Sequence, residues 1–150
     1  MREIVIGAAQ MGPIQRYDSR EVVVARMIVL LEEAIAAGCM LVIFTELCLT
    51  TFFPRWYMED EREVATWFEA KMPNAATQPL FDRARTAGVA ISFGYAEQTP
   101  EGQAFNTQLL TDPDLNIIGK YRKVHLPGHA EFDPDRAFQH LEKRYFQPGD

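Results

Sequence analysis

The sequence predicts an α/β protein built on one mixed sheet, and two patterns of apolar residues indicate this fold class. Apolar runs at 4–10 and 41–46 flank a segment with helical spacing, which is the pattern of a parallel β-α-β unit. Later runs at 89–97, 105–111 and 115–122 are separated only by short turns, which is typical of an antiparallel meander. We therefore expect parallel strands continued by antiparallel ones.

The first connecting segment has the start, the stripe and the stop of a helix. Asp18 and Glu21 have the spacing of a capping box, in which each side chain satisfies a free backbone N–H of the first turn. Gly38 follows the last periodic residue, where a left-handed cap is expected. The apolar positions that recur every three or four residues are Val24, Met27, Ile28, Leu31 and Ile35.

The second strand, residues 41–46, ends on the carboxylate of Glu46. A continuous apolar run of this kind is typical of a strand that is covered on both faces. Ligands of open α/β sheets gather at the carboxyl ends of the strands, so Glu46 stands where a reacting group is commonly carried. The alternative is a surface glutamate that closes a strand, and this stretch alone leaves both interpretations open.

Between this strand and the meander, the sequence predicts a loop and two helices. The loop at 47–58 is rich in aromatic residues, which either wall a pocket or pack beneath the loop. Helices are predicted over 59–70 and 79–87, with Gly88 as the stop of the second. Beyond Lys123, prolines and glycines predict little regular structure.

Composition and charge exclude several classes of protein. The 150 residues correspond to about one domain, and 47% apolar with 24% charged residues is an ordinary globular composition. A net charge of -6 disfavours a nucleic-acid or anionic-membrane partner. The sequence shows no apolar run that could span a bilayer, no signal-peptide pattern at its start and too few cysteines for a disulfide framework. We expect a cytoplasmic protein.

A second charged group ends another strand. Lys123 follows the last strand of the meander within the basic run 121–126, which taken alone is typical of a solvated edge. Together with Glu46 it favours a different interpretation, because two strand ends of one sheet can face each other across a crevice. Nucleophilic acyl transfer needs a carboxylate that takes a proton and a fixed cation that receives the developing oxyanion. These two residue types fit the two roles.

Four stretches carry a family resemblance. They are Val42-Ile43-Phe44-Thr45-Glu46-Leu47, Thr50-Thr51-Phe52-Phe53-Pro54-Arg55-Trp56, Gly119-Lys120-Tyr121-Arg122-Lys123-Val124-His125-Leu126-Pro127-Gly128-His129 and Phe138-Gln139-His140-Leu141-Glu142-Lys143-Arg144-Tyr145-Phe146. With them the sequence resembles the first half of a carbon–nitrogen hydrolase of the nitrilase superfamily, and it is most similar to the N-carbamoyl-D-amino acid hydrolases. Thr45 departs from the family pattern, which usually has proline before the glutamate.

The resemblance implies a fold and a set of site residues. The fold is half of an α-β-β-α sandwich of the nitrilase type, a mixed sheet with helices on the outer face. Glu46 would be the general base, Lys123 would stabilise the tetrahedral intermediate, and Glu142 would hold the lysine and help to orient the substrate. His125 and His140 match histidines placed near the substrate, although both could equally be hydrogen-bonded structural histidines.

The resemblance also implies a nucleophilic cysteine after a further strand, which the 150 residues do not contain. Cys39 is expected to be a small buried hydrophobe, and Cys48 lies close to Glu46 but on the wrong element. Asn106 matches a family position of structural character and receives no catalytic role. We expect residues 1–150 to be the N-terminal part of a single carbon–nitrogen hydrolase domain, truncated before the nucleophile, with an inner sheet face that makes it self-associate.

The activity that the resemblance implies is hydrolysis of N-carbamoyl-D-amino acids to D-amino acid, ammonia and CO2. The partner would be a small-molecule N-carbamoyl amino acid, with no cofactor and no metal, and the protein would form a homo-oligomer. Alternatives are another amidase, ureidopropionase or nitrilase of the superfamily, or a noncatalytic fragment. A metal site built from His125, His129 and His140 is a further alternative, which Pro127 and Gly128 disfavour because they break a helix between the first two histidines.

Overall fold

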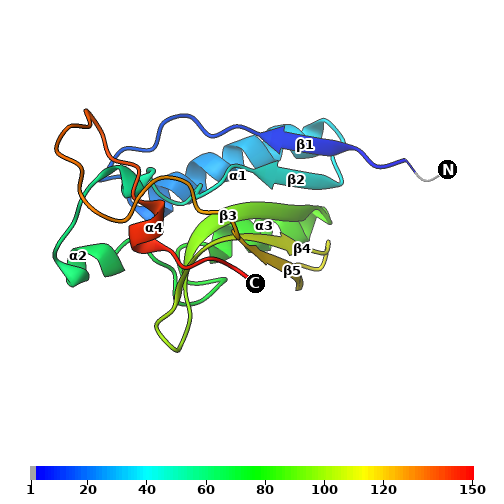
Figure 1. Ribbon diagram of the computed structural model, residues 1–150. Coiled ribbons are helices and arrows are strands. Elements are labelled where there is room, and N and C mark those ends of the chain that lie inside the picture. The colour runs from blue at the N-terminus through cyan, green and yellow to red at the C-terminus, as the bar shows by residue number, and fades with distance from the viewer. Residues whose placement is uncertain (1–2) are drawn as a thin grey trace.

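The computed structural model describes residues 3–150 and contains one sheet with the strand order β1-β2-β3-β4-β5 (Figure 1). The strands are β1 (Ile6–Ala9), β2 (Leu41–Phe44), β3 (Ala90–Gln98), β4 (Ala104–Thr111) and β5 (Ile117–Arg122). The first three are parallel, and β4 and β5 each run antiparallel to the strand before them, so the predicted mixed sheet is confirmed. Because β5 again runs parallel to β2, the carboxyl ends of these two strands lie at the same edge.

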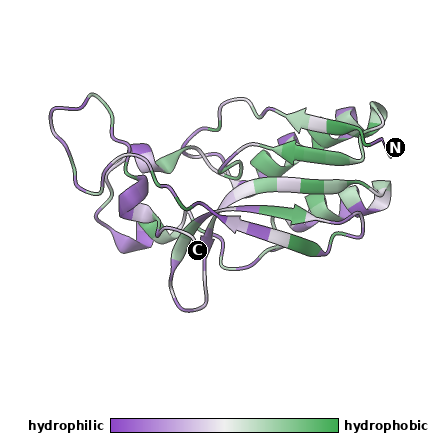
Figure 2. Ribbon diagram, turned by 45° about the vertical axis from the view of Figure 1, so that its right-hand side comes forward, coloured by the Kyte–Doolittle hydropathy of each residue, from purple (hydrophilic) through white to green (hydrophobic). Residues whose placement is uncertain are grey.

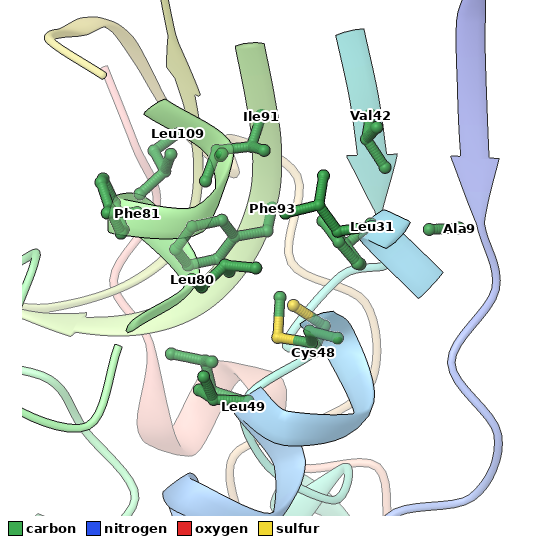
Figure 3. Packing of buried hydrophobic residues seen from close by; sticks show 14 of the residues in the cluster. Ala9, Leu31, Val42, Cys48, Leu49, Leu80, Phe81, Ile91, Phe93 and Leu109 are labelled. Carbon is green, nitrogen blue, oxygen red and sulfur yellow. The ribbon is translucent and has the colours of Figure 1, made fainter. Parts of the chain in front are cut away.

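Two long helices cover one face of the sheet. The helices are α1 (Arg20–Ala36), the 3-10 helix η1 (Phe53–Arg55), α2 (Glu61–Ala65), α3 (Gln78–Ala87) and α4 (Glu142–Tyr145). Side chains that point from the strands toward α1 and α3, among them Val42, Ile91 and Phe93, are fully buried (Figure 3). On the opposite face, Ile43 and Tyr121 are 39% and 58% exposed. The predicted placement of the helices on one side of the sheet is confirmed.

The start of α1 differs from the predicted capping box. Ser19 is the N-cap, and its hydroxyl accepts a hydrogen bond from the backbone N–H of Val22. The carboxylate of Asp18 instead accepts the backbone N–H of Gln15 at 2.8 Å, in the turn before the helix. Serine and aspartate suit an N-cap about equally well, so the prediction was wrong by one residue.

The body of α1 follows the predicted stripe. Val24, Met27 and Leu31 are buried in the core under the helix, together with Val23, which the pattern did not include. Gly38 adopts a φ of +76° just after the helix, as predicted.

The helix predicted over 59–70 is much shorter than expected, because α2 ends at Ala65. The backbone of Glu69 instead adds to the sheet: its N–H donates to Ala96 O at 2.8 Å, and its carbonyl accepts Gln98 N–H at 3.0 Å. These groups cannot also serve the helical ladder, so the pairing with β3 overrides the helical spacing of the sequence.

A second apolar cluster joins the loop after β2 to the last residues of the chain. The ring of Phe53 is buried, with its centroid 5.4 Å from that of Trp67 and 5.6 Å from that of Tyr145. The backbone N–H of Leu141 donates to Pro54 O at 2.7 Å. The loop that follows Glu46 is thereby fixed to the segment that carries Glu142. Figure 2 shows hydrophobic colouring along much of the sheet and hydrophilic colouring on the short helices at the other end of the molecule.

Within residues 3–150, no helix has the length and apolar character that crossing a membrane requires.

Candidate active site

Glu46, Lys123 and Glu142 come together at the carboxyl edge of the sheet. Glu46 lies two residues after β2, Lys123 directly follows β5, and Glu142 begins α4. The ammonium nitrogen of Lys123 lies 2.8 Å from Glu46 Oε1 and 2.9 Å from Glu142 Oε2. Glu46 is about half exposed, whereas only 2% of the Glu142 side chain is exposed. One cation therefore bridges an accessible acid and a buried one.

The backbone around Lys123 is fixed on both sides. Its N–H donates to the carbonyl of Asn106 at 2.8 Å, and its carbonyl accepts the N–H of Gly149 at 2.9 Å. The side chain therefore starts from a rigid strand end, which limits the positions that the ammonium group can reach.

Glu46 is held in a tight turn against β3. Leu47 has a φ of +46°, Gly94 N–H donates to Thr45 O at 3.2 Å, and Cys48 N–H donates to Gly94 O at 2.9 Å. A Cβ atom at Gly94 would lie 2.8 Å from the Cα of Glu46 and 2.7 Å from the nitrogen of Leu47. Only glycine fits this approach, and a glycine inside a strand is the sequence signal that could have indicated it.

Asn106, which was expected to have only a structural character, contacts both Glu46 and Lys123. Its side-chain amide donates to Glu46 Oε1 at 2.6 Å, while its backbone carbonyl accepts the N–H of Lys123. The residue lies on β4 and is 4% exposed. A buried amide near a strand end, at the edge where the charged residues gather, is the signal that could have identified it.

Hydrogen bonding favours the charged forms of Glu46 and Lys123. Partial burial raises the pKa of Glu46, but the hydrogen bonds from Lys123 and Asn106 outweigh burial and bring the pKa below its usual value. Burial lowers the pKa of Lys123, but the hydrogen bonds to Glu46 and Glu142 outweigh it and bring the pKa above its usual value. At neutral pH the site therefore presents a carboxylate beside an ammonium group.

Of the two predicted histidines, His140 lies in this cluster. Its Nε2 atom is 3.2 Å from Glu142 Oε1, and its ring meets that of Phe52 edge-on at a centroid distance of 5.3 Å. His125 is exposed, and its ring makes no hydrogen bond within residues 3–150. Among the described residues, hydrogen bonds and ion pairs link four of the five predicted site residues, and His125 takes no part in them.

A cavity of about 450 Å³ opens beside Glu46. Its walls include Phe52, Arg55 and Trp56 from the aromatic loop. This volume lies in the range of small-molecule sites. The aromatic loop therefore serves both purposes considered from the sequence, with Phe53 packed in the core and its neighbours lining a cavity.

The family model described as carbon-nitrogen hydrolase matches residues 5–150. The chain belongs to the carbon-nitrogen hydrolase family. A curated relative, the nitrilase of Pyrococcus abyssi (strain GE5 / Orsay), is 34% identical over 122 residues, which cover 81% of this chain and 39% of the relative. The omega-amidase NIT2 of Homo sapiens is 24% identical over 127 residues, which cover 85% of this chain and 42% of that protein. The chain thus spans about two fifths of the length of these relatives.

Solved structures share the fold of this carbon-nitrogen hydrolase chain. The carbon-nitrogen hydrolase from Helicobacter pylori G27 superposes with a TM-score of 0.72 at 24% identity, covering 98% of this chain and 45% of that one. An amidase from Nesterenkonia sp. AN1, in which acrylamide has added to the active site cysteine, gives a TM-score of 0.70 at 22% identity, covering 99% and 50%. These likenesses confirm the predicted fold class.

Neither cysteine of this carbon-nitrogen hydrolase chain is a plausible nucleophile at Glu46. Cys48 is 1% exposed and packs in the core with Leu31 and Leu80, where Figure 3 shows its sulfur among apolar side chains. Burial raises the pKa of its thiol to about 12, so almost no thiolate exists at neutral pH. Cys39 is partly buried and packs against the same core.

The last segment of the chain offers no arrangement of metal ligands. Within residues 3–150, no group of three or more His, Cys, Asp or Glu side chains could hold a metal ion. Residues 124–141 contain no helix, so His125 and His129 do not share a helical face. The Nε2 atom of His129 lies 3.0 Å from Gln139 Oε1 instead.

Proposed function

We propose that this chain supplies the base, the cation and the second acid of an amidohydrolase that acts on N-carbamoyl-D-amino acids. The observation that carries the proposal is the ammonium of Lys123, which lies between Glu46 and Glu142, while Glu46 itself lines a cavity. Family membership and the relatives named nitrilase and omega-amidase support hydrolysis of a C–N bond. The four stretches that resemble the carbamoylases support the choice of substrate.

In the proposed reaction, Glu46 takes a proton from a cysteine thiol contributed by the rest of the complete protein. The active-site cysteine of the Nesterenkonia amidase supports this choice of nucleophile. The thiolate attacks the carbamoyl carbon, and Lys123 stabilises the oxyanion that develops on the carbonyl oxygen. Glu46 returns the proton to the amino acid nitrogen as the C–N bond breaks, which releases the amino acid and leaves a carbamoyl thioester.

Water then completes the cycle. Glu46 takes a proton from the attacking water and gives it to the cysteine sulfur as the C–S bond breaks, which restores the thiol and the carboxylate. The carbamic acid that is released decomposes to ammonia and CO2. Glu142 contacts Lys123, and His140 lies next to Glu142. In the proposed reaction, Glu142 holds Lys123 in place and helps to orient the substrate, and His140 lies near the substrate. Four expectations stay predictions: the contribution of His125, the assignment of residues 1–150 to a single domain, the cytoplasmic location and the homo-oligomeric state.

The second candidate is hydrolysis of a nitrile or of an ω-amide. The relatives named nitrilase and omega-amidase favour it, because both match more than four fifths of this chain. The same base and cation would serve these substrates, since each reaction passes through a covalent adduct of the nucleophile.

A substrate panel tests the proposal. The complete protein would be assayed for ammonia release from N-carbamoyl-D-amino acids, their L-enantiomers, ω-amides of dicarboxylic acids, and aliphatic nitriles. We expect the N-carbamoyl-D-amino acids to give the highest kcat/KM. A higher kcat/KM for ω-amides or nitriles would replace our first candidate with the second, and release of ammonia from none of them would refute both.

A further inference from the structure

The segment 124–141 joins Lys123 to Glu142, so both of its ends enter the candidate site. It contains neither helix nor strand and forms the long orange loop in Figure 1. A loop without regular backbone bonds needs other contacts to fix its shape. In this loop, a buried side chain supplies them.

Gln139 ties the loop together across its base. It is 6% exposed, its Oε1 accepts the backbone N–H of Asp133 at 3.0 Å, and its Nε2 donates to the Asp133 carbonyl at 2.8 Å. The same Oε1 lies 3.0 Å from Nε2 of His129. Because an amide oxygen can only accept, His129 carries a proton on Nε2. The amide group of Gln139 is thus held in one orientation.

The two limbs of the loop also meet through the backbone. The N–H of His129 donates to the carbonyl of His140 at 3.0 Å. Gly128, with a φ of +78°, packs so closely on that carbonyl that any Cβ atom would overlap it. Gln139, His129 and Gly128 together therefore fix the backbone of His140. We call these three residues the loop clamp.

The position of His140 matters because its ring reaches Glu142. Its Nε2 atom lies 3.2 Å from Glu142 Oε1, and Oε2 of the same carboxylate lies 2.9 Å from Lys123 Nζ. The backbone between the two residues is anchored separately, since Leu141 N–H donates to Pro54 O. Loosening the loop clamp would therefore displace the ring of His140 while α4 stays in place.

We propose that Gln139 is a positioning residue, which holds His140 against Glu142 and thereby orients the carboxylate that faces Lys123. Its catalytic consequence rests on the proposed function, whereas the clamp itself does not. The Gln139→Leu substitution keeps most of the side-chain volume and removes all three polar contacts. It leaves the partly buried N–H of Asp133 without its acceptor, while the Asp133 carbonyl keeps only the N–H of Arg136 at 3.3 Å.

Hydrogen exchange tests the clamp without a substrate. In the complete protein, Gln139→Leu is expected to speed exchange of the His129 and Asp133 amides at least about tenfold, because their bonded states then open more often. Amides of β3 and β4 should exchange as before. The matched control is Gln78→Leu, which removes an exposed bond to Asp82 on α3 and should leave the loop unchanged. Unchanged exchange at His129 and Asp133 would overturn the clamp.

Steady-state kinetics test the positioning role. With whichever substrate of the panel the complete protein hydrolyses best, Gln139→Leu should lower kcat about tenfold and change KM less than about twofold. Gln139→Glu keeps the two acceptor bonds but loses the donor bond to the Asp133 carbonyl, so it should recover part of the lost kcat, which a general loss of stability would not explain. Faster exchange with an unchanged kcat would overturn the positioning role. A complete protein that hydrolyses nothing would refute the proposed function, and the exchange result would still decide the clamp.

Discussion

Replacing Gly94 should displace Glu46 without changing the Glu46 side chain itself. In Gly94→Ala, the new Cβ would start 2.7 Å from the nitrogen of Leu47 and 2.8 Å from the Cα of Glu46. Ordinary contact needs about 3.4 Å, so the turn that carries Glu46 must move away by about 0.6–0.7 Å. Both obstructing atoms belong to the backbone, so no side-chain rotation relieves the overlap.

Two effects of Gly94→Ala follow from that displacement. Overpacking of this kind costs about 1–3 kcal/mol of unfolding free energy. Because a shift of about 1 Å can cost a factor of about one hundred in rate, we expect kcat/KM to fall between about tenfold and one hundredfold. The assay is ammonia release by the complete protein, together with chemical denaturation of the same preparation.

Gly119→Ala is the matched control for this prediction. Gly119 also lies in a strand of the sheet, but its added Cβ would find its nearest neighbour, Leu110 Cβ, at 3.9 Å. We expect activity and stability near those of the unsubstituted protein. If Gly94→Ala behaved like Gly119→Ala in both assays, the close approach of β3 to the turn of Glu46 would be refuted.

Three further predictions concern other parts of the chain. Asn106→Leu removes a donor that lowers the pKa of Glu46, so the pKa should rise and the acidic limb of kcat/KM should move to higher pH; an unmoved limb would contradict this. Burial raises the pKa of Glu97, but hydrogen bonds from Arg122, Lys120 and Thr107 outweigh burial and bring the pKa to about 2. The stability that this carboxylate contributes is therefore present above its ordinary pKa and is lost as the pH falls from about 4.5 toward 2. Glu97→Gln should accordingly cost about 3 kcal/mol in denaturation at pH 7 and much less at pH 2, and an equal loss at both pH values would disprove the ion-pair explanation. The isolated chain exposes Ile6, Ile43 and Tyr121 on its open sheet face, so it should elute as a self-associated species in size-exclusion chromatography. Elution as a stable monomer would contradict this prediction.

The sheet and its long helices could be predicted because their signals are local. The stripe of α1, its glycine stop at Gly38 and the alternation of turns in the meander each depend on neighbours in sequence. The gathering of Glu46 and Lys123 at one edge followed from the same information, since the order of strands places both of their carboxyl ends there.

The parts that could not be predicted depend on pairings between distant residues. Helix α2 is short because Glu69 pairs with β3, which no helical propensity describes. The bond from Asn106 to Glu46 depends on how β4 is placed relative to the turn after β2, and strand patterns leave that placement open. The clamp made by Gln139 lies in a loop without periodicity, so its hydrogen bonds leave no repeating signal in the sequence.

In the proposed function, Glu46 acts as the base of a C–N hydrolase site that it shares with Lys123. The most direct test of this role is the rate of ammonia release from an N-carbamoyl-D-amino acid by the Glu46→Gln variant of the complete protein. The control is Glu32→Gln, which replaces an exposed glutamate paired with Arg83 on the outer helices. We predict that Glu46→Gln lowers kcat by about 10²–10⁴ while the control keeps its activity. A Glu46→Gln variant that is folded and retains more than about a tenth of kcat would show that Glu46 is not the base.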